Sequence, residues 1–256
     1  GGPPGRLDSP STTSPEKADP VSNAELQKTR ERETRLAKAT KYHLDPGSGR
    51  VATVTAYDIP LASGLRPVIW RPLTLSEAAL HWRHHQQAPT PADLALFDTT
   101  VKRWHTETRD GVDTIVAETE HRSDDRNGFS MRAEYRMPGD GMLHVAYEIR
   151  PRVEVAWLPE VGMEIDLVGR GMNTLDWVGL GPLAAWPNKK AAAAFGRWSE
   201  YPPGGGTKAG VQWAAVGGGV GLQVVGAPYV RHEPAAGDGL PRLRILSAVA
   251  GRNGKF

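Results

Sequence analysis

Apolar–polar alternation in residues 129–137 and 143–150 limits the possible folds of this chain more than any other feature. Residues 115–121 form a β-prone segment, and two more segments alternate with period two. Their apolar positions are Phe129, Met131, Ala133, Tyr135 and Met137, then Leu143, Val145, Tyr147 and Ile149. Such alternation is typical of strands with one buried and one solvated face. Turn sequences at 123–128 and 138–141 separate the segments. We therefore predict three adjacent antiparallel strands in a mainly β protein, a large antiparallel β-sandwich.

Further strands and two short helices are expected around these three strands. The predicted strands cover 50–57, 65–70, 153–157, 163–168, 211–213, 220–225 and 240–250, with a glycine turn at 217–219. One helix is predicted over 74–87, because Thr74 and Glu77 have the spacing of a capping box. The other is predicted from Pro91 to about Trp104, since proline suits the first position of a helix.

The N-terminal part has a different composition from the rest. Residues 1–20 are mostly Pro, Gly, Ser and Thr, so we predict disorder there. Residues 21–45 are predicted to be a basic helical arm, and 50–256 the β-sandwich domain. Ser22 and Glu25 form a capping box, and the helix is expected to reach Tyr42. Its apolar stripe is thin, and its basic residues are Arg30, Arg32, Arg35, Lys38 and Lys41. The arm is either solvated or docks onto a partner or RNA.

Composition narrows the classes of function. The formal charge of +2 over 256 residues argues against general nucleic-acid binding by the folded part, so the basic arm is the one candidate for such binding. There is no cysteine, which excludes disulfides, zinc-thiolate sites and thiol catalysis. No apolar run is long enough to span a bilayer, and no signal-peptide pattern is visible. We expect no membrane association, no cofactor, and an intracellular location in the cytoplasm or an organelle.

The segment 175–198 contains three tryptophans, Trp177, Trp186 and Trp198, in a strand followed by a proline-containing loop. Glycines and prolines there predict a stiff irregular loop leaving the sheet. So many rings imply either a large buried aromatic area or a surface that binds carbohydrate. Because Trp177 lies in the strand itself, its ring is expected in the core.

The same segment resembles the C-terminal domain of glycoside hydrolase family 2 β-galactosidases, which is the small chain in two-subunit members. The resemblance runs from about Arg50 to about Val225. Its scaffold residues are Trp70, Arg71, Gly179, Gly181, Pro182, Pro187, Lys189, Phe195, Gly196 and Arg197. It implies a galactose-mutarotase-like sandwich of the β-galactosidase C-terminal type.

This chain departs from the family pattern at its polar signature positions. Ala184, Trp186, Asn188 and Lys189 replace the Glu, Tyr, Asp and Arg of the family, and 74–77 and 202–207 also differ. The polar signature of the family's last strands is missing. These departures suggest a kept fold with a lost or altered role.

The resemblance implies that catalysis resides elsewhere. A retaining glycosidase needs two closely spaced carboxylates, which in this family lie in a separate barrel domain. No carboxylate pair is recognisable here, so we predict no catalytic residue. His81 with His84 or His85 has helical metal-ligand spacing, but no third ligand is evident, so no metal site is predicted.

Three functions remain open. The first is a non-catalytic accessory or small chain of a galactoside-hydrolysing enzyme. The second is a structural or docking subunit of a larger assembly, and the third, weaker, is a carbohydrate-binding module. Because the family's last strands are missing, sheet edges or core surface would be left uncovered. We therefore expect a protein partner, either a catalytic barrel subunit or a larger assembly.

Overall fold

The computed structural model describes residues 23–72, 97–125, 127–152, 158–185, 190–217 and 221–249. Within these ranges the chain forms one helix, α1 (Asn23–Ala39), and fifteen strands. The strands are β1 (Thr40–Asp45), β2 (Arg50–Ala56), β3 (Ile59–Val68), β4 (Asp98–Arg109), β5 (Val112–Arg122), β6 (Gly128–Arg136), β7 (His144–Arg152), β8 (Glu160–Leu167), β9 (Leu175–Gly181), β10 (Ala194–Glu200), β11 (Lys208–Ala209), β12 (Trp213–Val216), β13 (Leu222–Val225), β14 (Tyr229–Glu233) and β15 (Arg242–Val249). The protein is mainly β, as predicted.

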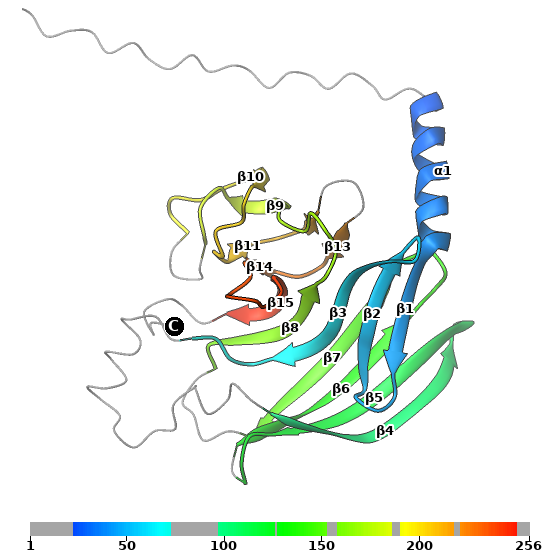
Figure 1. Ribbon diagram of the computed structural model, residues 1–256, viewed down its shortest axis with the longest axis vertical. Helices are drawn as coiled ribbons and strands as arrows, with labels where there is room; N and C mark the ends of the chain where they lie inside the picture. The colour runs from blue at the N-terminus through cyan, green and yellow to red at the C-terminus, as the bar shows by residue number, and fades with distance from the viewer. Residues whose placement is uncertain are drawn as a thin grey trace, which may run out of the picture.

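The strands of the described residues form three antiparallel sheets (Figure 1). The largest has seven strands in the order β1-β2-β3-β8-β15-β14-β11, so the late strand β15 lies between β8 and β14. Two four-stranded sheets have the orders β4-β5-β6-β7 and β10-β9-β12-β13. Sequential hairpins build the β4–β7 sheet, whereas segments far apart in the chain build the seven-stranded one.

The three strands predicted from alternation are confirmed as β5, β6 and β7, which pair in sequence order. On β6, Phe129, Met131, Ala133 and Tyr135 are all at most 3% exposed, and Ser130 and Arg132 between them are exposed. The same alternation on β7 gives only half-buried apolar side chains, because β7 is an edge strand. The period of the sequence thus correctly identified which face packs inward.

A single hydrophobic cluster joins the three sheets. It includes Val51 and Leu167 from the seven-stranded sheet, Tyr135 from β6 and Trp177 from β9. At the β1–β2 turn, the Tyr135 hydroxyl donates a hydrogen bond of 3.3 Å to the carbonyl of Gly49. The seven-stranded sheet therefore shares its core with both smaller sheets, as in a sandwich.

The prediction of a helix from Pro91 to about Trp104 is wrong in its second half, which is a strand. Residues 98–109 form β4, which pairs with β5 along its length. A register shift between Val101 and Arg103 breaks the two-residue alternation, so the sequence did not show a strand period. Residues 73–96, including the predicted helix 74–87 and the start of the second helix, lie outside the described residues.

The predicted helical arm is helical only to Ala39. Residues 40–45 form β1, the edge strand of the seven-stranded sheet, and Thr40 to Asp45 pair with β2. The segment predicted as disordered, together with Ser22, lies outside the described residues. The helix in the described part is too short and too polar to cross a membrane.

Most other strand predictions are confirmed, including β2, β3, β8, the β12–β13 pair and β15. Residues 153–157 lie outside the described residues.

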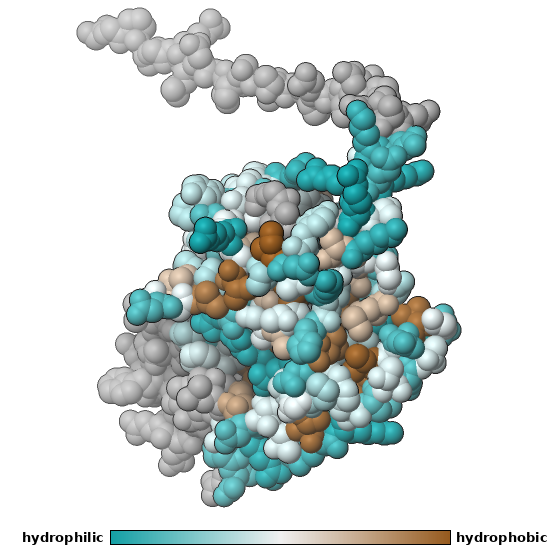
Figure 2. All heavy atoms as spheres, turned by 45° about the vertical axis from the view of Figure 1, so that its right-hand side comes forward, coloured by the Kyte–Doolittle hydropathy of each residue, from teal (hydrophilic) through white to brown (hydrophobic). Residues whose placement is uncertain are grey.

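On the face of the molecule shown in Figure 2, apolar side chains appear as separate islands among hydrophilic ones, and α1 is hydrophilic along its visible length.

Candidate functional site

Trp177 lies in the core of the β9 sheet. Along β9 the residues on one face are buried and those on the other are half-buried, as the alternation in LDWVGLG indicates. The Trp177 side chain is 1% exposed, and its indole N–H donates a 3.1 Å hydrogen bond to the carbonyl of Leu180. Packing therefore accounts for this ring, which has no free face to offer a ligand.

Trp198 on β10 lies directly opposite Trp177 in the register. Its indole N–H donates to the carbonyl of Gly179 at 3.2 Å, and its ring is half-buried. A Cβ on Gly181 would come within 2.6 Å of the ring, and one on Gly196 within 3.3 Å. These two glycines leave the space that the indole occupies, which explains why the Gly-x-Gly and Phe-Gly-Arg motifs occur together.

A buried lysine, Lys208, lies beside the Trp177 ring. We call Trp177, Trp198 and Lys208, with the glycines around Trp198, the aromatic centre. Lys208 on β11 is 2% exposed, and its Nζ lies 4.5 Å from the centroid of the Trp177 ring. The same Nζ is 2.9 Å from Oε2 of Glu200 on β10. An ammonium group out of water needs a counter-charge and favours an aromatic face. Lys208 thus links β11 to β9 and β10.

The other predicted site residues are dispersed. Arg71 is buried, and the Trp70 carbonyl accepts a 2.9 Å hydrogen bond from Arg244. Phe195 is 58% exposed on the outer face of β10, where the Arg197 guanidinium lies 5.9 Å from the Trp213 ring centroid. Pro182 is exposed, and Trp186, Pro187 and Lys189 lie outside the described residues. Carbohydrate binding by Trp186 and Trp198 stays a prediction.

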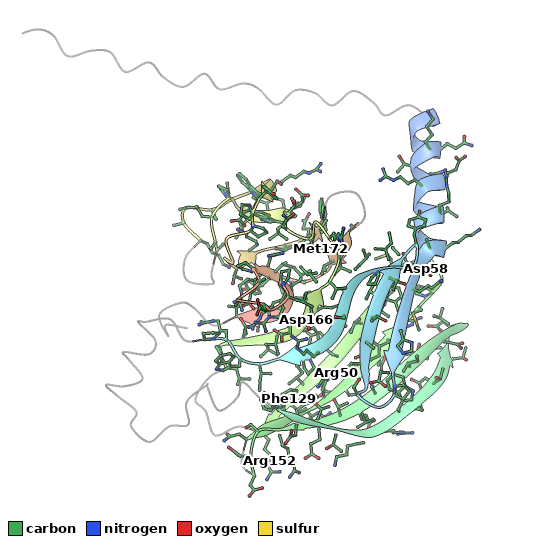
Figure 3. All side chains as sticks on the ribbon, viewed as in Figure 1. Arg50, Asp58, Phe129, Arg152, Asp166 and Met172 are labelled. Carbon is green, nitrogen blue, oxygen red and sulfur yellow. The ribbon has the colours of Figure 1, made fainter. Side chains whose placement is uncertain are left out.

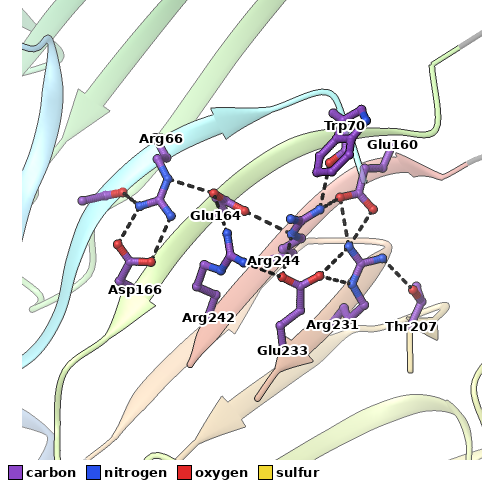
Figure 4. A network of polar contacts seen from close by, with 11 residues as sticks. Arg66, Trp70, Glu160, Glu164, Asp166, Thr207, Arg231, Glu233, Arg242 and Arg244 are labelled. Atoms are coloured by element: carbon purple, nitrogen blue, oxygen red, sulfur yellow. Dashed lines mark hydrogen bonds and ion pairs between the residues drawn. The ribbon is translucent and has the colours of Figure 1, made fainter. Parts of the chain in front are cut away.

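Sequence reasoning missed a ladder of ion pairs across the seven-stranded sheet (Figure 4). Its half-exposed end is Arg66 on β3. This guanidinium binds both carboxylate oxygens of Asp166 on β8, at 2.7 and 2.9 Å. It also donates a 2.8 Å hydrogen bond to Glu164, four positions from Glu160 along the same strand.

The other end of the ladder is almost fully buried. Glu160 is 0% exposed and bonds to both Arg231 on β14 and Arg244 on β15. Arg244 also contacts Glu164 at 3.1 Å and Glu233 at 3.2 Å, and Arg242 lies 3.6 Å from each of those two carboxylates. The ladder therefore connects four neighbouring strands, β3, β8, β15 and β14.

The arrangement balances charge rather than preparing groups for catalysis. The ladder contains four arginines, Arg66, Arg231, Arg242 and Arg244, and four carboxylates, Glu160, Glu164, Asp166 and Glu233. Burial lowers the pKa of Arg244 to about 10, which still leaves the guanidinium charged at neutral pH. Each carboxylate of the ladder is held by at least one guanidinium, whereas a catalytic carboxylate must be free to meet a substrate. The ladder suits holding strands together.

A second buried polar group, His121 on β5, was also missed. Its Nδ1 lies 3.0 Å from the Thr99 hydroxyl and its Nε2 2.8 Å from the Thr119 hydroxyl. The ring stacks on Phe129, with centroids 4.3 Å apart (Phe129 is labelled in Figure 3). Burial, and then the nearby charge of Arg50, lower the pKa of His121 to about 4, so the imidazole is neutral at pH 7.

No group of three metal-ligating side chains occurs in the part of the chain that the structure describes. The histidines whose spacing could bridge a metal, His81, His84 and His85, lie outside that part.

A sequence model of the β-galactosidase small chain matches residues 37–233. This chain belongs to the β-galactosidase small-chain family. It is 29% identical over 108 residues to β-galactosidase 2 of Enterobacter cloacae, an alignment that covers 41% of this chain and 10% of that protein. It is also 29% identical over 94 residues to the β-galactosidase of Photobacterium profundum, covering 32% and 9%. The chain thus spans about a tenth of the length of these relatives.

The matched region extends beyond the predicted limits of the resemblance at both ends. It includes β1 before Arg50 and reaches the last residue of β14 after Val225. The aromatic centre lies wholly inside it. Arg242 and Arg244 of the ladder lie after it on β15, and most of α1 lies before it.

Proposed function

We propose that this chain is a non-catalytic accessory domain of a galactoside-hydrolysing enzyme, acting beside a catalytic subunit that supplies the two carboxylates. The observation that supports the proposal most directly is the ladder. Its acidic side chains are each engaged by at least one guanidinium. Membership of the small-chain family agrees with an accessory role beside a larger β-galactosidase chain.

The test uses the purified chain and a chromogenic β-galactoside. We expect no turnover by the chain alone, and restored or increased turnover when it is mixed with a cognate catalytic subunit that lacks its own small chain. Trp177→Ala in the same mixture is the matched control, because an unfolded accessory chain should not restore activity. Turnover by the chain alone, abolished by a single acidic-to-amide substitution, would contradict the proposal.

A docking role in a larger assembly is the second candidate. It is favoured by α1, whose exposed basic residues lie almost wholly outside the region that matches the family. An element added to the family domain is a natural place for a contact that the galactosidase reaction does not require. Activity and assembly are separable: an assembly subunit would co-sediment with its complex and leave galactoside turnover unchanged.

A further inference from the structure

We propose that α1 and the β2–β3 turn at its base form a docking surface for an acidic protein. We call it the arm surface and define it as α1, Tyr57 and Asp58 of the β2–β3 turn, and Ile59 at the start of β3. This inference concerns an element outside the galactosidase function, and it stands whether or not the accessory role is correct.

Within the described residues, the contacts that anchor the helix are at its C-terminal end. Ala37 lies against the β6–β7 turn, where a Cβ on Gly141 would be 2.8 Å from the Ala37 side chain. The carbonyl of Ala39 accepts a 3.1 Å hydrogen bond from the Tyr57 backbone, and the Tyr42 hydroxyl donates a 2.7 Å bond to the Gly141 carbonyl. From this base α1 projects away from the sheets (Figure 1), with Asp58 beside its foot (Figure 3).

A basic stripe runs along the side of the helix that faces away from the body. Lys28, Arg32 and Arg35 follow the i, i+4, i+7 spacing of one helical face. At about 100° per residue, Lys28 and Ala37 are half a turn apart, so the stripe points into solvent while Ala37 faces the β6–β7 turn. The three side chains are exposed, and within the described residues none of them has an ion-pair partner. They are therefore available to an acidic surface.

An apolar island, made of Tyr57 and Ile59, lies at the foot of the helix, where the Tyr57 backbone meets Ala39. Tyr57 is 52% exposed and Ile59 54%. Tyr57 and Asp58 have positive φ values of 52° and 60°. Positive φ at both central residues is what a two-residue hairpin turn requires, and Tyr57 and Asp58 are the two residues between the paired Ala56 and Ile59. The turn thus holds an aromatic ring exposed beside a projecting helix.

The combination favours a protein over a nucleic acid. Apolar anchors surrounded by charge are the usual anatomy of a protein interface, with the apolar part as the centre. A phosphate backbone offers nothing apolar to cover Tyr57 and Ile59. A second copy of this chain would set one basic stripe against another. The chemistry that fits is a protein surface bearing carboxylates beside apolar side chains.

The test measures binding of the full chain to a fluorescein-labelled amphipathic helical peptide, with glutamates at i, i+4 and i+7 beside a row of leucines. Fluorescence anisotropy is recorded at physiological salt, where contacts longer than about 8 Å are screened. We expect saturable binding that weakens about tenfold in Arg32→Glu, whose side chain lies in the stripe. Arg30→Glu makes the same charge change on another face of the same helix, and should change the affinity less than about threefold.

The apolar island is tested in the same assay. Ile59→Ser should weaken peptide binding about fivefold, whereas Leu240→Ser, at another exposed apolar position (49%) remote in sequence, should have no effect. Circular dichroism checks that each variant keeps its fold. Absence of peptide binding, equal effects of the paired variants, tighter binding to labelled oligo(U), or a chain dimer in sedimentation that Arg32→Glu dissociates would each overturn the proposal.

Discussion

Trp177 and Glu160 are both almost fully buried, but for opposite physical reasons. The Trp177 ring lies in the hydrophobic cluster that joins the sheets, and its burial removes a large apolar area from water, which lowers the free energy of the folded state. Glu160 loses its hydration on burial, and ion pairs with two guanidiniums from β14 and β15 compensate for this loss. The aromatic centre therefore contributes stability directly, whereas we expect the ladder chiefly to determine which strands pair.

The largest effect is expected from the aromatic centre. Trp177→Ala should lower the free energy of unfolding by about 3–5 kcal/mol, the range for truncating a buried large aromatic residue. Urea denaturation followed by circular dichroism measures it. Phe195→Ala, which removes an exposed ring from the neighbouring strand, should stay within about 0.5 kcal/mol. A cost below about 1 kcal/mol for Trp177→Ala would contradict the claim that burial of this ring stabilises the fold.

Breaking the ladder at its buried end should cost slightly less. Glu160→Gln keeps the shape of the side chain but removes the buried carboxylate that Arg231 and Arg244 share, and leaves the ladder with one excess positive charge, so we expect a loss of about 3 kcal/mol. The control is Asp58→Asn, which breaks the exposed 2.6 Å pair with Lys41 and should cost less than about 1 kcal/mol. Equal losses for the two variants would show that burial of the ladder has no energetic consequence.

His121 combines both kinds of contact, since it stacks on an aromatic ring and lies near Arg50. Its pKa falls from 6.5 to about 4 on folding. The unfolded chain therefore binds the proton first as the pH falls, and stability is lost between those two values. Going from pH 7.5 to 4.5 should cost about 2–3 kcal/mol through this group. Urea titrations at both pH values should show a smaller drop in His121→Gln than in the wild type, whereas His144→Gln, at an exposed site, should drop like the wild type.

The smallest of these effects should come from the glycine that accommodates Trp198. Gly181→Ala puts a methyl group 2.6 Å from the ring, so the indole must move, at about 1–2 kcal/mol. Tryptophan emission should shift to the red as the ring becomes more exposed. Gly204→Ala is the matched control, because its nearest neighbour is the end of the flexible Glu200 side chain at 3.1 Å. An unchanged spectrum in Gly181→Ala would contradict the proposed role of Gly181.

Sequence patterns predicted the aromatic centre better than the ladder because its contacts are local. Trp177 and the two glycines of β9 lie within five residues, and β10 follows on the same sheet. Ladder partners are far apart: 100 residues separate Arg66 from Asp166, and 84 separate Glu160 from Arg244. In sequence, Glu160, Glu164 and Asp166 look like the solvated face of a strand. Only the strand order places arginines opposite them.

Two errors at element boundaries have a similar cause. The helical prediction extends over 40–45 because the residues before this segment are good helix formers. It extends over 98–104 because Pro91 suits the start of a helix. Both segments instead pair with a neighbour, β2 or β5, and this pairing outweighs local preference. The β-branched run Thr99, Thr100 and Val101 was a signal for a strand that the helical interpretation overlooked.

The position of β15 also sets the order in which the molecule can be completed. A ribosome delivers β8, β11 and β14 before residues 242–249, yet β15 lies between β8 and β14. Until that strand has emerged, the growing polypeptide holds two partial sheets with unpaired edges. Over the same interval the carboxylates of Glu160 and Glu233 have Arg231 but lack the arginines of β15. Closure of this sheet is therefore a late event during translation, and the nascent protein carries its exposed strand edges until then.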